Sequence, residues 1–232
     1  MGDRYAPAAR STPFKVCCIQ SREEAETALA AGASAIGLVA EMPSGPGPIS
    51  DALIADIAAA MRGRVRTVLL SSRTDAAGLI HHVRSTGCDT LQIVDHVGRE
   101  VRAAVREALP QVAIWQVLHV EGEASLDLVS ALADGADALL LDSGSPAAAT
   151  RQLGGTGRAH DWSISARIVT ASPVPVWLAG GLSPANARQA VEQVRPFGLD
   201  ICSGLRTAGA LQPDRLAAFA SLLSEPSHVE AT

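Results

Sequence analysis

The stretch FKVCCIQSREEAETALAAGASAIGLVA (residues 14–40) contains a complete strand–helix–strand unit. The apolar run at 14–19 predicts a first strand, the segment 22–32 a helix that ends at a glycine, and the segment 34–40 a second strand. Both strand segments are apolar throughout, which is typical of parallel strands covered on both faces. The stretch therefore predicts a parallel βαβ unit.

The same alternation of strand and helix continues along the chain. Further strands are predicted at 65–71, 89–94, 111–120, 136–142, 174–181 and 197–204. Further helices are predicted at 50–61, 75–87, 99–109, 123–135, within 154–169, at 183–194 and at 213–223. Eight right-handed units of this kind close most economically into a parallel eight-stranded (β/α)8 TIM barrel. An open doubly wound sheet is the alternative, but its glycine fingerprint after the first strand is absent.

The bulk composition fits one compact domain. The chain has 232 residues, of which 47% are hydrophobic and 19% charged, so it can bury a substantial core. We expect a flexible extension at 1–13, one barrel domain at 14–224 and a tail at 225–232. A formal charge of −5 without a long charged run argues against a nucleic-acid partner. Neither a membrane-spanning run nor a signal-like N-terminus is visible, so we expect a cytoplasmic protein without membrane contact.

Candidate catalytic residues follow the predicted strand ends, because active sites of this barrel class lie at the C-terminal ends of the strands. The four cysteines lack zinc-ligand spacing, and neighbouring cysteines rarely bridge, so neither a metal site nor a disulfide scaffold is expected. The strand-end candidates are Cys17, Cys18, Asp95, His96, His119, Glu121 and Asp142. Strand alternation predicts that Cys17 faces the barrel mouth and Cys18 the helical layer.

Three polar, glycine-containing loops follow the last three predicted strands. Their backbone N–H groups can approach a ligand closely, as in an anion cradle. Each loop alone is weak evidence, since tight turns between strand and helix use glycine anyway, but three at one rim favour a phosphate site. The candidate phosphate-binding residues are Gly154, Gly155, Thr156, Gly157, Gly180, Gly181, Ser203 and Gly204.

Several motifs together resemble a known family. The segments KVCCIQ, LQIV, LLLDS, GGTGRAHDW, VWLAGGLSPANA and GLDICSGL are similar, in order and separation, to those of phosphoribosylanthranilate isomerases of tryptophan biosynthesis. The resemblance runs from about Lys15 to Leu223. It implies an Amadori rearrangement of a phosphoribosyl-amine, with Cys17 as general base and Asp142 as general acid. No metal or organic cofactor is required, because the imine formed on ring opening is itself the electron sink.

The chain departs from the family motifs around the expected substrate. Gly47 stands where the family has an arginine, and Val94 where it has a histidine. Cys18 replaces a glycine, Gln20 a threonine, and a glutamate is replaced in the region of Arg206. These changes leave the substrate itself open, and also whether the loop at 42–49 is a lid or a fixed rim.

Three functions therefore remain to be separated. The first is isomerisation of a small phosphorylated sugar-amine by a monomer or homodimer, with Gln92 and His119 as candidate substrate contacts. The second is a related sugar-phosphate isomerase or lyase that uses His119 or Asp95. The third is a non-catalytic barrel that binds a phosphorylated ligand, a role that retention of Cys17 and Asp142 disfavours.

Overall fold

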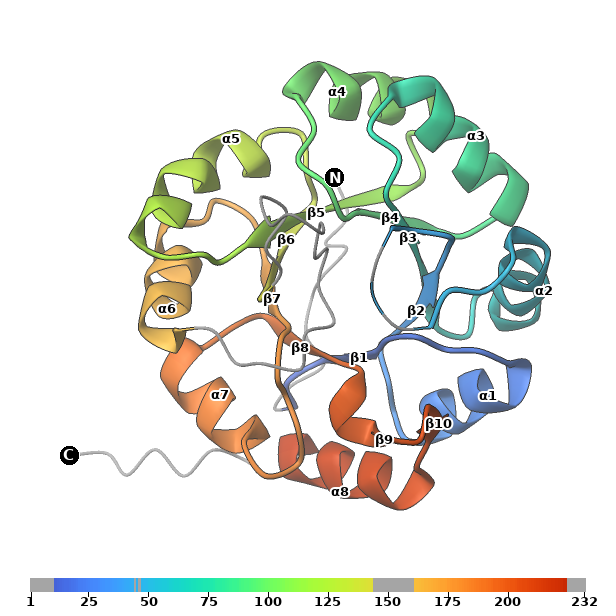
Figure 1. The fold of residues 1–232 in the computed structure, drawn as a ribbon, viewed down its shortest axis with the longest axis vertical. Coiled ribbons are helices and arrows are strands. Elements are labelled where there is room, and N and C mark those ends of the chain that lie inside the picture. Colours follow the sequence, from blue (N-terminus) through green and yellow to red (C-terminus); the bar gives the residue numbers. More distant parts are fainter. Residues whose placement is uncertain (1–10, 44, 46, 144–160, 225–232) are drawn as a thin grey trace.

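The computed structural model describes residues 11–43, 45, 47–143 and 161–224. Eight parallel strands form a closed barrel in the order β1 to β8, with the helices in a ring outside it (Figure 1). Closure is made by β1 and β8, where Phe14 pairs with Leu199 and Val16 with Ile201. The predicted (β/α)8 barrel is confirmed.

The barrel strands are β1 (Phe14–Val16), β2 (Ala35–Val39), β3 (Arg66–Ser71), β4 (Thr90–Ile93), β5 (Ala113–His119), β6 (Ala138–Asp142), β7 (Val176–Leu178) and β8 (Gly198–Ile201). The α-helices are α1 (Arg22–Ala30), α2 (Asp51–Met61), α3 (Ala76–Thr86), α4 (Arg99–Ala108), α5 (Val129–Ala133), α6 (Trp162–Ala171), α7 (Ala187–Val194) and α8 (Pro213–Ser224). None of these described helices is long and apolar enough to cross a membrane.

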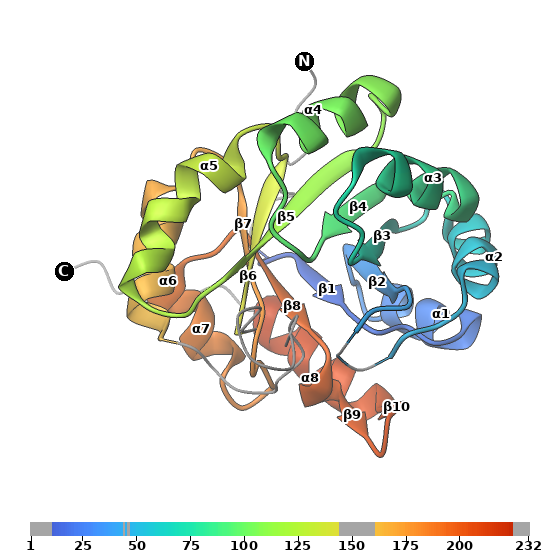
Figure 2. The same ribbon diagram turned by 45° about the horizontal axis from the view of Figure 1, so that its top comes forward.

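Two features differ from the sequence prediction. The helix expected at 123–135 is a 3-10 helix (Glu123–Leu128) followed by the short α5. A two-stranded antiparallel hairpin, β9 (Arg206–Thr207) and β10 (Ala210–Leu211), lies between β8 and α8 and projects from the barrel in Figure 2. Pairs this short carry no periodic signal in the sequence, which is why the hairpin was missed.

Polar side chains fix where several helices begin. Ser21, Ser50 and Asp75 each accept a hydrogen bond from the backbone N–H three residues further on, at α1, α2 and α3. Asp161 caps α6 by accepting from Ser163 N at 2.8 Å. Residues close in the chain therefore determine where these helices begin, and with that where the preceding loops end.

Buried apolar residues form two clusters that alternate along the strands. The outer cluster includes helix residues such as Leu79 and Val105, so it fills the layer between strands and helices. The inner cluster fills the barrel and contains Cys17, Cys18, Ala35, Val39, Val68, Leu70, Val94, Ala113, Trp115, Val117, Ala138, Leu140, Trp177 and Ala179. Trp115 and Trp177 stack there with ring centroids 4.7 Å apart. This alternation decides which strand-end side chains reach the mouth.

His82 on α3 is buried between helix and barrel. Its Nδ1 lies 2.9 Å from Ser71 Oγ, its Nε2 lies 3.1 Å from Asp51 Oδ1, and its side chain is 4% exposed. Burial lowers the pKa of His82, and the nearby Asp51 opposes that shift without cancelling it. The imidazole is therefore held neutral near pH 7.

We expect the free energy of unfolding to fall as the pH is lowered below the unfolded-state histidine pKa of about 6.5. Below this pH the histidine of the unfolded chain binds a proton, whereas folded His82 binds one only at still lower pH. The contribution of His82 to the free energy of unfolding is therefore complete above the unfolded-state pKa and declines below it. Urea denaturation at pH 7.5 and 5.5 measures the change, and His82→Gln is the control that reduces it. An equal pH dependence in this variant would contradict the assignment.

Candidate active site

Two of the strand-end candidates, one after β1 and one at the end of β6, face the barrel interior. In β1, Phe14 and Val16 belong to the outer cluster, whereas Cys17, which follows the strand, belongs to the inner one. In β6, Leu139 and Leu141 are outer, so Asp142 at the strand end faces inward. The two residues expected as base and acid therefore face the same interior.

Lys15 lies at the centre of a buried polar network beneath the mouth. Its ammonium group is 2.7 Å from Asp200 Oδ2 and 3.0 Å from Gln92 Oε1. It also lies 3.4 Å from the sulfur of Cys17. The Lys15 side chain is fully buried and that of Asp200 is 6% exposed, so this ion pair is screened little by water.

The network favours the thiolate form of Cys17. A hydrogen bond from Cys18 lowers the pKa of the Cys17 thiol, burial opposes the shift, and the charge of Lys15 adds to it. Burial acts to lower the pKa of Lys15, but the charges of Asp200 and Cys17 outweigh it and raise that pKa. A permanently charged ammonium group beside a thiol is the usual way to generate a reactive thiolate near neutral pH.

Gly37 on β2 provides the space that the thiol occupies. A Cβ atom at this position would lie 2.7 Å from Cys17 Sγ and 2.9 Å from Lys15 Cε. Only glycine therefore leaves the thiol and the ammonium group where they are. No sequence pattern indicates this role.

We expect Gly37→Ala to lower kcat by roughly 10–100-fold, because a displacement of the base by about 1 Å is costly to catalysis. A steady-state assay measures the rate, and a urea midpoint close to that of the wild type separates displacement from unfolding. An unchanged rate would show that the thiol does not need its present position.

Asp142 is held beside the loop that follows β7. Its Oδ1 accepts a hydrogen bond from Ser143 N at 2.7 Å. A Cβ atom on Gly180 would lie 3.3 Å from the same oxygen, so the glycine leaves this carboxylate uncovered on that side. Burial raises the pKa of Asp200, Lys15 opposes that shift, and the charge of Asp142 adds to it.

The loops after β7 and β8 form one surface at the mouth. Asn186 accepts a hydrogen bond from Ser183 N at 2.8 Å and donates one to Gly181 O at 2.9 Å, which fixes the first loop. Gly204 lies against the backbone of Leu182 and Ser183, in a space that no Cβ could share. Among the described residues, the amides of Gly180, Gly181, Ser203 and Gly204 donate to no acceptor. The candidates Gly154, Gly155, Thr156 and Gly157 lie outside the described residues.

Cys18 does not face the helical layer, contrary to the expectation from strand alternation. The strand ends at Val16, and Cys18 has a left-handed backbone with φ of 63°, so its side chain turns into the inner cluster. This backbone conformation favours glycine, which is the residue that the resemblance led us to expect there. A Cβ atom on Gly47 would lie 2.7 Å from that of Cys18, so these two departures are in contact.

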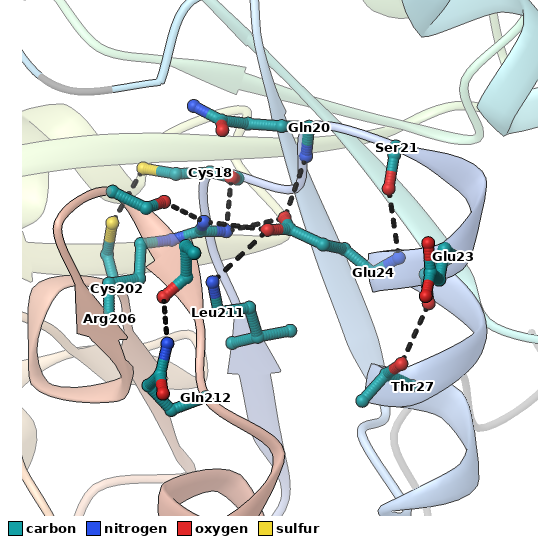
Figure 3. A network of polar contacts seen from close by, with 12 residues as sticks. Cys18, Gln20, Ser21, Glu23, Glu24, Thr27, Cys202, Arg206, Leu211 and Gln212 are labelled. Carbon is teal, nitrogen blue, oxygen red and sulfur yellow. Dashed lines mark hydrogen bonds and ion pairs between the residues drawn. The ribbon is translucent and has the colours of Figure 1, made fainter.

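Arg206 joins the loops after β1 and β8 (Figure 3). Its guanidinium group pairs with both carboxylate oxygens of Glu24, at 3.0 and 2.8 Å, and donates to Cys18 O at 2.5 Å. The side chains of Arg206 and Glu24 are 8% and 18% exposed. The charge at position 206 is thus matched by Glu24 on α1.

The two candidate substrate contacts are both buried. Gln92 accepts from Lys15, and His119 Nε2 donates to Val94 O at 2.9 Å. The Nδ1 of His119 has no hydrogen-bond partner among the described residues. In the loop at 42–49, a β-bridge joins Pro48 to Val39, so its C-terminal end is attached to the barrel.

Sequence reasoning missed Lys15, Asp200 and Gly37 as parts of the site. A signal was present, because Lys15 and Asp200 are single charges within strands that are otherwise apolar. Closure of the barrel makes their strands neighbours, and opposite charges buried side by side form a pair. Within the described ranges, no group of three or more His, Cys, Asp or Glu side chains could hold a metal ion.

A (β/α)8 barrel with a thiol beside a buried ammonium group and a carboxylate facing the same interior is an arrangement suited to acid–base catalysis. Comparison with known proteins gives the particular family. The family model of N-(5'-phosphoribosyl)anthranilate isomerase matches residues 14–221. The chain therefore belongs to this family and is an enzyme that converts an aldose-type phosphoribosyl-amine into its ketose isomer by an Amadori rearrangement.

Individual relatives agree with this assignment. The chain is 34% identical over 210 residues to N-(5'-phosphoribosyl)anthranilate isomerase of Thermosynechococcus vestitus, covering 90% of this chain and 88% of the relative. It is 36% identical over 207 residues to the isomerase of Afipia carboxidovorans, covering 88% and 86%. The crystal structure of phosphoribosyl anthranilate isomerase from Thermus thermophilus superposes with a TM-score of 0.76 at 26% identity, covering 91% of this chain and 98% of that one.

Proposed function

We propose that the chain acts on phosphoribosylanthranilate with Cys17 as general base and Asp142 as general acid. The observation that carries this assignment is the contact between the buried ammonium group of Lys15 and the Cys17 sulfur, 3.4 Å apart. It favours a thiolate at the one strand end where the family places its base. The inward-facing carboxylate of Asp142 supports the complementary role.

Each residue then has one proton to move. As general acid, Asp142 gives a proton to the ring oxygen as the C1–O bond breaks and an iminium forms between C1 and nitrogen. The iminium acidifies the proton on C2, and the Cys17 thiolate removes it to give an enolamine. The enolamine then tautomerises to the 1-amino-1-deoxyketose. Cys17 then gives its proton to solvent and Asp142 takes one up, so the enzyme returns to its starting state and atoms and charge balance without a cofactor.

We further propose that the loops after β7 and β8 bind the substrate phosphate. The amides of Gly180, Gly181, Ser203 and Gly204 support this, since none donates to an acceptor among the described residues. Several backbone N–H groups that point into one concavity commonly bind a phosphate. They can do so even though this chain has a net negative charge. Gly154, Gly155, Thr156 and Gly157 would complete the cradle.

The residues expected around the amine part of the substrate differ from those of the family motifs. An isomerase of the same fold has been solved in complex with reduced 1-(o-carboxyphenylamino)-1-deoxyribulose 5-phosphate, at 21% identity to this chain. Here Gly47 and Val94 provide neither the arginine nor the histidine that the family motifs carry. These losses favour, as a second candidate, a phosphoribosyl-amine whose amine lacks the anthranilate carboxylate.

The direct test is loss of substrate fluorescence when the purified protein is mixed with phosphoribosylanthranilate. We expect a first-order decay that depends on enzyme concentration. If the protein is inert, mass spectrometry of reactions with phosphoribosyl-amines that carry other substituents tests the second candidate. No turnover of any of them, combined with a ligand-induced rise in melting temperature, would favour a binding protein and contradict the proposal.

We also propose that the enzyme works in the cytoplasm as a monomer or homodimer. A solved isomerase of this fold from Thermotoga maritima is described as dimeric, at 21% identity. Light scattering coupled to gel filtration distinguishes the two states by mass. A larger assembly would contradict the proposal.

A further inference from the structure

Two cysteines that the proposed mechanism does not use lie in contact at the mouth. The sulfur atoms of Cys18 and Cys202 are 2.7 Å apart (Figure 3). They follow the neighbouring strands β1 and β8, which are still joined at this level, because Cys17 N donates to Ile201 O at 2.8 Å. Neither cysteine is in a disulfide in this structure.

The surroundings hold both loops in place. Arg206 donates to Cys18 O at 2.5 Å and is itself bound by Glu24, so the backbone at Cys18 is anchored to the segment that follows Cys202. A disulfide requires a sulfur separation of about 2.05 Å, which is a further approach of well under 1 Å. Little backbone movement is therefore needed to join the two sulfurs.

Access from solvent is unequal between the two thiols. Cys18 is 4% exposed, whereas Cys202 is only partly buried. An oxidant would therefore meet Cys202 first, and Cys18 would act as the resolving thiol. The pair is therefore reached from solvent through Cys202.

We propose that Cys18 and Cys202 form a reversible disulfide that lowers the activity of the enzyme. The oxidant is a small disulfide such as oxidised glutathione. The Cys202 thiolate attacks one of its sulfurs, forming a mixed disulfide and releasing one glutathione thiol. Cys18, losing its proton to solvent, then attacks the Cys202 sulfur and releases the second glutathione. Two protein thiols are oxidised by two electrons, and one disulfide is reduced to two thiols.

A disulfide between Cys18 and Cys202 would change the protonation of Cys17, the proposed base, because Cys18 is its neighbour. In the reduced protein the Cys18 thiol donates a hydrogen bond to Cys17, which is the largest of the influences that lower the pKa of Cys17. A disulfide sulfur has no proton to donate, so oxidation leaves Lys15 as the remaining support of the thiolate. The same bond also constrains the loop that carries Ser203 and Gly204. This effect on the rate rests on the proposed function, whereas formation of the bond does not.

The test begins with incubation of the protein in oxidised glutathione, blocking of remaining thiols, and tryptic digestion without reductant. Tryptic cleavage places Cys18 in the peptide 16–22 and Cys202 in the peptide 189–206. We expect these two peptides joined by a disulfide, and their release by dithiothreitol. Isomerase activity should fall at least several-fold in the oxidised sample and recover on reduction.

The peptide 16–22 contains both Cys17 and Cys18, so variants are needed to show which of the two is cross-linked to Cys202. Cys17→Ser should still form the cross-link, whereas Cys18→Gly and Cys202→Ser should not. For each active variant, the rate after oxidation is divided by the rate of the same variant before oxidation. This fraction should stay close to one for Cys202→Ser. Cys88→Ala, which changes a cysteine in the outer cluster, should respond as the wild type does.

Three outcomes would overturn the proposal. They are no cross-link at any concentration of oxidised glutathione, a cross-link that persists in Cys18→Gly but is lost in Cys17→Ser, and full activity of the cross-linked protein. The mass spectrum does not depend on turnover. A cross-link in a protein without isomerase activity would therefore reject the proposed function and leave the disulfide standing.

Discussion

Replacing Cys17 by Ala, or Asp142 by Asn, should lower kcat/KM by about 10²–10⁴-fold, the usual contribution of one proton-transfer group. Cys17→Ala removes the group that takes the proton from C2. Asp142→Asn retains the shape of the side chain but cannot give a proton to the ring oxygen. The fluorescence assay with phosphoribosylanthranilate measures both, and the double variant should be little worse than the slower single variant.

Two controls show whether a loss of rate comes from unfolding or from the removal of any buried thiol. Far-ultraviolet circular dichroism and the urea midpoint establish that each variant is folded. Cys88→Ala is the matched thiol control, since Cys88 is buried in the outer cluster, and it should keep the wild-type rate. Rates within twofold of wild type in either Cys17→Ala or Asp142→Asn would reject the assigned role of that residue.

Lys15→Met should have the largest effect on stability, a loss of about 3–5 kcal/mol in the free energy of unfolding. The reason is that Asp200 remains buried without the ammonium group that lies 2.7 Å from it, and Gln92 loses its donor as well. An apolar side chain of similar length fills the space but offers no compensating charge. Urea denaturation at pH 7 measures the difference.

The double variant Lys15→Met/Asp200→Leu is the control for this explanation. It removes both charges, so it should regain most of the stability that Lys15→Met loses. A double variant as unstable as Lys15→Met would show that the loss comes from packing rather than from the uncompensated carboxylate.

Lys15→Met also changes the pH profile of the reaction. The rate requires the Cys17 thiolate, so kcat/KM rises as pH increases through the pKa of that thiol. The charge of Lys15 helps to lower this pKa, and its removal should therefore shift the acidic limb of the profile to higher pH. An unshifted limb in a folded variant would mean that Lys15 does not influence the base.

Much of the barrel could be predicted from the sequence because strand and helix signals are local. The apolar strands, the helix caps at Ser21, Ser50 and Asp75, and the count of βα units all follow from residues near one another in the chain. The inward positions of Cys17 and Asp142 also followed, since a site of this fold lies at the strand ends. The hairpin of β9 and β10 did not, because two-residue strands leave no periodic pattern.

What the sequence alone determined is the architecture, the family resemblance and the two residues expected to move protons. The tertiary structure decided what surrounds them: the ion pair of Lys15 and Asp200, the space left by Gly37, and the meeting of Cys18 with Cys202. Lys15 and Asp200 are separated by 185 positions in the chain, and Cys18 and Cys202 by 184; both pairs touch because β1 closes the barrel against β8. Gly37 meets Cys17 because β1 pairs with β2. Local patterns specify the elements, whereas the pairing of strands and the closure of the barrel set which side chains share a low-dielectric interior and shift one another's protonation.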